Sequence, residues 1–492
     1  MLLLSILPED VLLKVLAVTA RPDAARMMRT SHFLYHEGPK IILREPIHIS
    51  SGKELSLFLE FLHAEGTRRP QFVRSLDVSV PDANGLAAAL PRMTRLQTLS
   101  VPTDGDMLYK WHSELAAAFV GMPSIRFLTL SNCMFDVGLQ VLKTFQSQLV
   151  CVRVHFLSIL SEPLFVTISD ATLSELHPAE LLSHSQGTLE ELQTYGWQTH
   201  RDVPPDPSIV YPKMRRLDLE RTGLPLTVAY MRAYPNISHL RYCTFEGEMH
   251  LRDGAAIQLY DARHRLNVTA QAASSFTWTH LEEFHGNLVD LYMLGLNCTT
   301  DRLFLRFGPD ELCYQVDPVL SPTRPRHLEF SQGWPGELSG PAGRVFDVFR
   351  GAGGSRLESL HFRIGLGRKH RDVDFSAVMV RLRASLSCTP LQELKATISL
   401  ENLDTQPRAG ALVKLSRLQA GLRATPPPSD PADCPLCPAE HSATVFDLKA
   451  WMGELIKVIV TIHKAEVILE GPRGRWRRTS FASGQMQYEE KA

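Results

Sequence analysis

The feature that most constrains the fold of this chain is an internal repeat. Residues 86–99 (LAAALPRMTRLQTL) and residues 115–128 (LAAAFVGMPSIRFL) align without gaps at an offset of 115 − 86 = 29. Each copy has apolar residues at helical spacing, then a turn, then an apolar-x-x-apolar strand pattern. One such strand-plus-helix unit cannot cover its own apolar face, so neighbouring units must stack to bury a continuous core.

The strand half of this repeat recurs along most of the chain. Adjacent spacings between the leucines of these strand-like units include 99 − 76 = 23, 128 − 99 = 29, 217 − 192 = 25 and 240 − 217 = 23 residues. These periods resemble the roughly 20–29 residues of leucine-rich repeats, although the asparagine of the standard repeat is mostly missing apart from Asn132. We therefore expect an α/β fold, an irregular leucine-rich-repeat solenoid of short parallel strands with helices on its convex side. A set of unrelated strands in an α/β domain is the alternative.

The middle residue of each Leu-x-Leu unit is predicted to lie on the concave face, because alternate strand residues point to opposite sides. The candidate target-binding residues chosen in this way are Asp77, Ser100, Thr129, Asp218, Arg241 and His361. Their mixed charge favours a protein ligand over a nucleic acid. Each position could also be a solvated strand residue without a ligand.

Composition excludes several other classes. Hydrophobic residues make up 44% and charged residues 21% of the 492, which is typical of globular chains. Lys and Arg (52) balance Asp and Glu (53), so the net charge of 52 − 53 = −1 argues against nucleic-acid binding. Eight cysteines are too few for a disulfide scaffold. No apolar run spans a membrane and no signal peptide is evident, so we expect an intracellular protein.

The first fifty residues follow a different pattern. Pro8, with acidic residues behind it, predicts a helix start, and apolar residues then repeat along one face. Pro22 and Pro39 start two further predicted helices, and residues 47–49 form a short predicted strand. The leucine-rich first face exceeds what so small a unit can hide. It is predicted to bind a partner helix surface or to dock on the rest of the same chain.

Three segments carry a family resemblance. Residues 7–16 (LPEDVLLKVL), 23–26 (DAAR) and 30–35 (TSHFLY) together resemble an F-box, most closely that of the large fungal families. The resemblance covers about residues 5–49 and lacks the tryptophan that many animal members carry in the third helix. It implies docking to a Skp-type adaptor and, through it, to a cullin–RING ubiquitin ligase. The residues that match the adaptor-contacting positions of the family are Leu7, Pro8, Leu12, Leu13 and Leu16.

Three regions are expected on this basis. Residues 1–49 form the F-box-like helices, residues 50–472 the repeat array with a proline-rich loop near 424–438, and residues 473–492 a basic and polar tail. The predicted function is substrate recognition for a Skp–cullin–F-box ubiquitin ligase, with an unknown target protein. The alternative is a repeat scaffold in which the N-terminal helices serve only as a cap.

No catalytic motif or cofactor site is predicted. The chain has no Gly-x-Ser-x-Gly elbow, no P-loop and no His-Glu-x-x-His. Cys434, Cys437 and His441 have the spacing of half a zinc site, but no second Cys-x-x-Cys is present to complete it. We therefore expect no metal, no cofactor and no enzymatic activity, and a zinc-dependent enzyme is the least favoured alternative.

Overall fold

The computed structural model divides the chain into two compact units, Met1–Ile237 and Ser238–Ala492. The structure describes residues 7–64, 68–80, 85–102, 117–120, 122–133, 135–156, 177–197, 204–244, 254–306, 314–330, 341–367, 370–403, 436–471 and 476–491. Each unit is an α/β array built on an open, mostly parallel sheet.

The first unit begins with four short helices, α1 (Glu9–Val18), α2 (Arg21–Met28), α3 (His32–Glu37) and α4 (Pro39–Ile42). Proline lies at or next to the start of α1, α2 and α4, where its missing N–H costs no helical hydrogen bond. The helices pack around a small apolar core. Its buried members are Leu12, Leu16, Ala24, Met28 and Leu34.

The sheet of the first unit follows the order of the sequence, and all of its strands are parallel. Its strands are β1 (Ile47–Ile49), β2 (Ser75–Val78), β3 (Thr98–Pro102), β4 (Phe127–Cys133), β5 (Cys151–Phe156), β6 (Glu191–Tyr195) and β7 (Arg216–Thr222). One ladder of buried side chains crosses it in register from β2 to β7. Its members are Leu76, Leu99, Leu128, Val152, Leu192 and Leu217.

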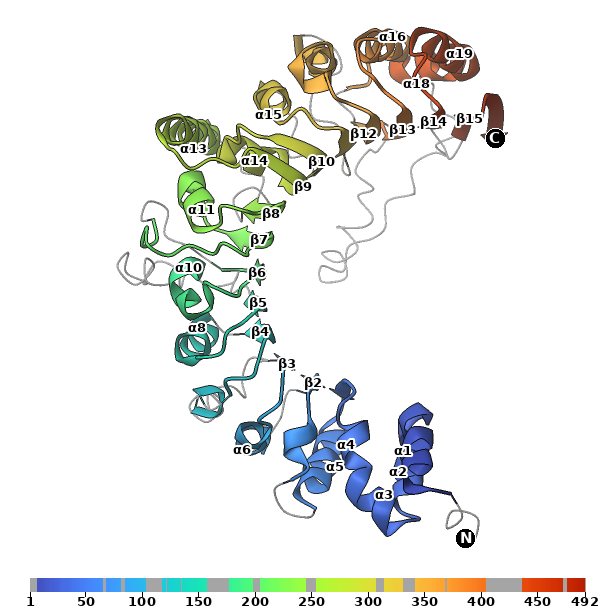
Figure 1. Cartoon of the computed structure of the whole chain (residues 1–492). Helices are drawn as coiled ribbons and strands as arrows, with labels where there is room; N and C mark the ends of the chain where they lie inside the picture. Colours follow the sequence, from blue (N-terminus) through green and yellow to red (C-terminus); the bar gives the residue numbers. More distant parts are fainter. Residues whose placement is uncertain are drawn as a thin grey trace, which may run out of the picture. The chain divides into compact units, whose positions relative to one another are not determined.

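Helices lie on one side of these strands in the described crossovers (Figure 1). They are α5 (Gly52–His63), η2 (Pro70–Phe72), α6 (Leu86–Ala89), η3 (Leu90–Arg92), α8 (Phe135–Thr144), α10 (Pro178–Leu181), η6 (Ser183–Ser185) and α11 (Thr227–Ala233). Parallel strands require such crossover connections, and the helices cover the apolar face that a single strand leaves open.

One backbone feature shows the repeat at the level of single residues. Asn132, Gly196 and Arg221 each lie four residues after the buried leucine of their strand, and each has a positive φ, of 56°, 77° and 51°. This left-handed conformation favours glycine and asparagine. The turn geometry therefore persists at residue 221, where the sequence has neither.

The second unit repeats the arrangement with longer strands. β8 (His239–Thr244), β9 (His280–Asn287), β10 (Thr299–Arg306), β11 (His327–Phe330), β12 (Ser359–Gly367), β13 (Glu393–Asn402) and β14 (Lys464–Glu470) pair in parallel and in sequence order. β15 (Trp476–Ala482) and β16 (Gln485–Lys491) then add in antiparallel fashion. The buried ladder of this sheet comprises Leu240, Phe284, Leu303, Leu328, Leu360, Leu394 and Ala465.

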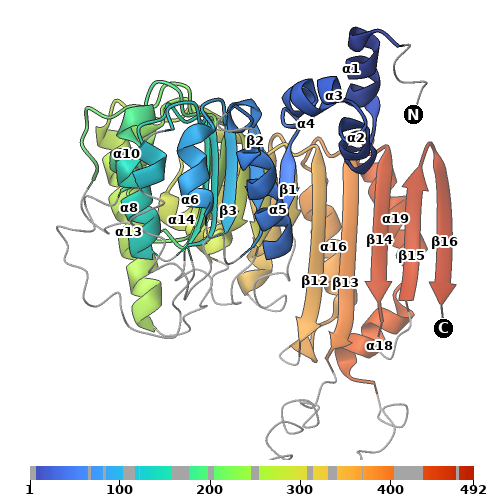
Figure 2. The ribbon, with the colours of Figure 1, turned by 90° about the horizontal axis from the view of Figure 1, so that it is seen from below.

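Figure 2 shows β12 to β16 side by side, with α16, α18 and α19 against one face. The crossover helices of this unit are α13 (Gly254–Ala273), α14 (Leu288–Leu294), α15 (Val316–Thr323), η8 (Pro341–Arg350), η9 (Ala352–Gly354), α16 (Phe375–Leu386), α18 (Pro438–Val445) and α19 (Leu448–Val458). A hydrogen bond joins two of these helices. The Trp451 indole N–H in α19 donates to the Met379 carbonyl in α16 at 2.8 Å.

Several expectations need correction. The predicted tail at 473–492 is wrong over residues 476–491, because they form the β15–β16 hairpin that pairs with β14. α3 is a helix that the proline-based pattern missed. β1, predicted with the N-terminal helices, is the first strand of the sheet through its pairing with β2. Most of the predicted proline-rich loop, residues 424–435, lies outside the described residues, and Pro438 begins α18.

Candidate protein-binding surfaces

The outer side of α1 presents apolar side chains, but the predicted adaptor-contacting set divides between surface and core. Leu12 and Leu16 are 5% and 1% exposed, because they pack against α2 and α3. Leu7 and Pro8 are exposed and Leu13 is half-buried. The exposed apolar surface of α1 extends instead to Val15 and Val18, of which Val18 is 87% exposed.

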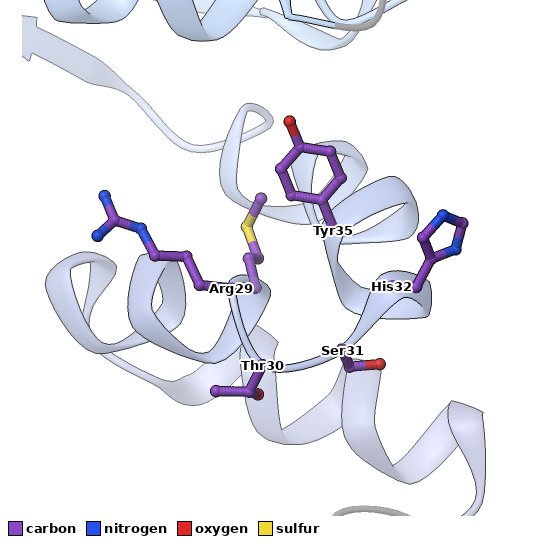
Figure 3. A pocket seen from close by; sticks show the side chains of 6 residues that line it. Arg29, Thr30, Ser31, His32 and Tyr35 are labelled. Atoms are coloured by element: carbon purple, nitrogen blue, oxygen red, sulfur yellow. The ribbon is translucent and has the colours of Figure 1, made fainter.

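A pocket of about 420 Å³ lies beside these helices, where α2 meets α3 (Figure 3). It is lined by Met28, Arg29, Thr30, Ser31, His32 and Tyr35. His32 and Tyr35 come from α3, and the other side chains come from the end of α2 and the loop after it. This pocket gives the N-terminal helices a recess of mixed polarity between α2 and α3.

Arg69 fixes α3 to the rest of the first unit. Its guanidinium is buried between two rings, with its carbon 4.6 Å from the centre of Tyr35 and 4.4 Å from that of Phe61. It also donates to the Phe61 carbonyl at 3.0 Å and to the Tyr35 carbonyl at 3.3 Å. A guanidinium stacked and bonded in this way is a rigid connection. The N-terminal helices are therefore held in one orientation on α5.

Each unit also has a strand face, the side of its sheet that points away from its crossover helices. In the first unit a single register row crosses it and contains four of the predicted residues. The row comprises His48, Asp77, Ser100, Thr129, Arg153, Gln193 and Asp218. Asp77, Ser100 and Thr129 are half-buried, whereas Asp218 is buried and offers a partner little area.

The corresponding row of the second unit contains the other two predicted residues and is richer in charge and aromatic rings. It comprises Arg241, His285, Phe304, Glu329, His361, Lys395 and Glu466. The His285 and Phe304 rings stack with centroids 4.2 Å apart and an interplanar angle of 8°. The Glu283 carboxylate forms a hydrogen bond with the same imidazole, at 2.8 Å from His285 Nε2.

Ion pairs between neighbouring strands organise the rest of this face. Lys464 donates to the Glu393 carboxylate at 2.6 Å, and this hydrogen bond is the main reason that the pKa of Glu393 lies below its usual value. His361 Nε2 lies 3.6 Å from the same carboxylate, within ion-pair range but beyond a hydrogen bond. Near the start of these strands, Asp301 in β10 contacts His280 in β9, and Arg326 and Arg356 in the segments before β11 and β12, at 3.4, 3.7 and 2.9 Å. Paired charges of this kind give a face specificity for the charge pattern of a partner.

Sequence reasoning missed His285 and Phe304. The signal was available, because Leu303-Phe-Leu305 is a Leu-x-Leu unit like the others. Phe304 is half-buried at the surface of the strand face, where an aromatic side chain supplies more contact energy than the small polar residues of the predicted set.

The possible zinc half-site gains no support from the described residues. Cys434 lies outside them. Cys437 is the N-cap of α18, and its backbone N–H donates to the Glu440 carboxylate at 2.8 Å. In the part of the chain that the structure describes, no three His, Cys, Asp or Glu side chains gather to hold a metal ion.

No protein-family model matches this chain, and a comparison with curated proteins finds no match. Among the described residues, no helix combines the length and apolar character needed to cross a membrane. The structure thus defines the class of the protein as an α/β array with open, mostly parallel sheets.

Proposed function

We propose that this protein is the substrate-recognition subunit of a Skp–cullin–F-box ubiquitin ligase. The observation that carries the proposal is the exposed apolar side of α1, with Leu7, Val15 and Val18, next to helices that resemble an F-box. An apolar helix surface of this kind typically binds a partner helix. The adaptor would occupy this surface and connect the chain to a cullin–RING ligase.

The strand face would then hold the target protein. Several of its charges are paired within the sheet, and its half-buried aromatic pair, His285 and Phe304, resembles the centre of a protein interface. The chain would act by proximity alone, raising the effective concentration of the target near the ubiquitin-charged enzyme. No residue of the chain is assigned a catalytic role.

The experiment is co-purification of the full chain with a recombinant Skp-type adaptor. Leu12 and Leu16 are unsuitable positions for it, because a charge in the helical core would unfold the helices whether or not they bind a partner. The variant is Val15→Asp with Val18→Asp, which alters exposed side chains. Val460→Asp in the second unit is the matched control, because Val460 and Val18 are both 87% exposed.

We expect the native chain and Val460→Asp to form a one-to-one complex and the double variant to lose at least tenfold in affinity. If the native chain fails to bind the adaptor, the ligase proposal is wrong. If all three chains bind the adaptor equally well, the exposed side of α1 is not part of the interface.

A second function is favoured by a different observation. Arg69 ties α3 firmly to α5, which is what a terminal cap of a repeat array requires. In that case the protein is a binding scaffold that uses its strand face without any ligase. The co-purification decides between the two, because a cap alone does not bind the adaptor.

A further inference from the structure

Helix α3 carries two histidines one turn apart that face each other. The Nε2 atoms of His32 and His36 are 3.0 Å apart, and the ring centroids are 4.2 Å apart at an interplanar angle of 63°. Both side chains are exposed. Residues four apart lie on the same side of a helix, which is why histidines at this spacing serve as paired metal ligands in helical sites.

The separation of the two nitrogens fits chelation. Metal–imidazole bonds are about 2.0–2.1 Å long, so two such bonds at a right angle place their nitrogens about 2.9 Å apart. A tetrahedral angle would place them about 3.3 Å apart, within small side-chain rotations of the observed geometry. The two nitrogens now lie at hydrogen-bond distance from each other, and their separation matches that of two imidazole nitrogens bound to one ion.

The helix that carries the pair is held in place. Tyr35, between the two histidines in sequence, stacks on Arg69, and its carbonyl accepts from the same guanidinium. The neighbouring Glu37 carboxylate is engaged by Lys40, with both oxygens 2.6 Å from Nζ. Ligands fixed by the surrounding structure lose little conformational freedom when a metal binds.

We propose that His32 and His36 form a binding site for a divalent transition-metal ion of the imidazole-preferring group, Cu²⁺, Ni²⁺ or Zn²⁺. The two imidazoles supply two ligands, and water completes the coordination from the solvent side. Neutral imidazole favours these ions, whereas Mg²⁺ and Ca²⁺ prefer oxygen ligands. With only two protein ligands, the ion exchanges readily. The site does not rest on the proposed function, although it lies on the same group of helices.

The test is a titration of the full chain with Zn²⁺ in competition with a chromophoric chelator. His32→Gln and His36→Gln each remove one ligand. His463→Gln is the matched control, because His463 is also exposed and has no histidine four residues away. Equal thermal midpoints of the four metal-free chains establish that each variant is folded.

We expect the native chain and His463→Gln to bind one more equivalent of Zn²⁺ than either α3 variant. Cu²⁺ added at one equivalent should show coupling to two nitrogens in its electron paramagnetic resonance spectrum. Equal binding by all four chains would overturn the proposal. So would loss of the equivalent in His463→Gln, or in only one of the two α3 variants, because the ion would then not bridge the pair.

Discussion

The rings of His285 and Phe304 stack face to face across β9 and β10, with centroids 4.2 Å apart. One residue earlier in each strand, Phe284 and Leu303 form part of the buried ladder on the opposite side of the sheet. Adjacent residues on these strands therefore have different structural roles. One pair builds the core, and the other builds the surface available to a partner.

This division predicts losses of stability of very different size for two phenylalanine substitutions. Phe284→Ala removes a fully buried ring and should lower the free energy of unfolding by about 3–5 kcal/mol. Phe304→Ala should cost about 1 kcal/mol, because its ring is partly exposed and its stacking contact is modest. Urea unfolding followed by peptide-resolved hydrogen exchange over residues 280–306 measures both. Equal losses would contradict the assignment of Phe304 to the surface.

Asp290 predicts a loss of stability as the pH rises. Its buried carboxylate accepts from the Thr244 hydroxyl at 2.5 Å, the Thr244 N–H at 3.1 Å and the Asn287 amide at 2.9 Å. Burial nevertheless raises the pKa of Asp290 to about 7. Between about pH 4 and pH 7 the folded state keeps a proton that the unfolded state releases, so the free energy of unfolding falls as the pH rises.

Asp290→Asn cannot titrate and tests this expectation. Relative to the native chain, the variant should gain stability on the order of a few kcal/mol between pH 4 and pH 7. Hydrogen exchange of peptides covering β8 to β10, measured at both pH values, reports the change. A difference between variant and native chain that stays constant with pH would show that Asp290 does not titrate in this window.

The burial of His177 predicts that the free energy of unfolding of the first unit rises with pH, opposite to the effect of Asp290. Its ring is fully buried, and its Nδ1 accepts from the Ala179 N–H at 3.1 Å at the start of α10. Burial lowers the pKa of His177 to about 3. The unfolded state therefore takes up a proton near pH 6.5 that the folded state refuses, and the stabilisation present above pH 6.5 is lost as the pH falls toward 3.

His177→Asn keeps an acceptor for the helix start but does not titrate. We expect a flatter dependence of unit 1 stability on pH between 6.5 and 4, together with a lower maximum because the contact with the Tyr230 ring, at 5.5 Å, is lost. Urea unfolding monitored by Trp197, buried in this unit, follows the change. An unchanged acid slope would contradict the role given to His177.

The β15–β16 turn predicts a purely conformational effect. Ser483 and Gly484 have φ values of 51° and 79°, which is the pattern of a type I′ turn between paired strands. A Cβ at Gly484 meets no atom within 4 Å, so Gly484→Val costs only backbone strain, about 1–2 kcal/mol. Ser483→Asn should stabilise the hairpin by a few tenths of a kcal/mol. Exchange rates of the amides in residues 476–491 should move in opposite directions in the two variants.

Much of the array could be predicted from the sequence. The leucines of the repeat, such as Leu99, Leu128 and Leu217, were placed correctly in the core because strand alternation and helix period are local properties of the chain. The same reasoning failed for residues 476–491. Their polar and basic composition resembles a solvated tail, whereas only pairing with β14 makes them strands.

The sequence by itself determined the repeat, the positions of its leucine-containing strands and the helix starts at the prolines, because periodicity and backbone restriction act within a few residues. The tertiary structure decided which apolar side chains are exposed. Leu16 and Val15 are neighbours with similar chemistry, and only packing against α2 and α3 buries one and leaves the other on the surface. It also decided the contacts of Arg69 with α3 and of His285 with Phe304, because these join residues from different elements, whose separation no local pattern encodes.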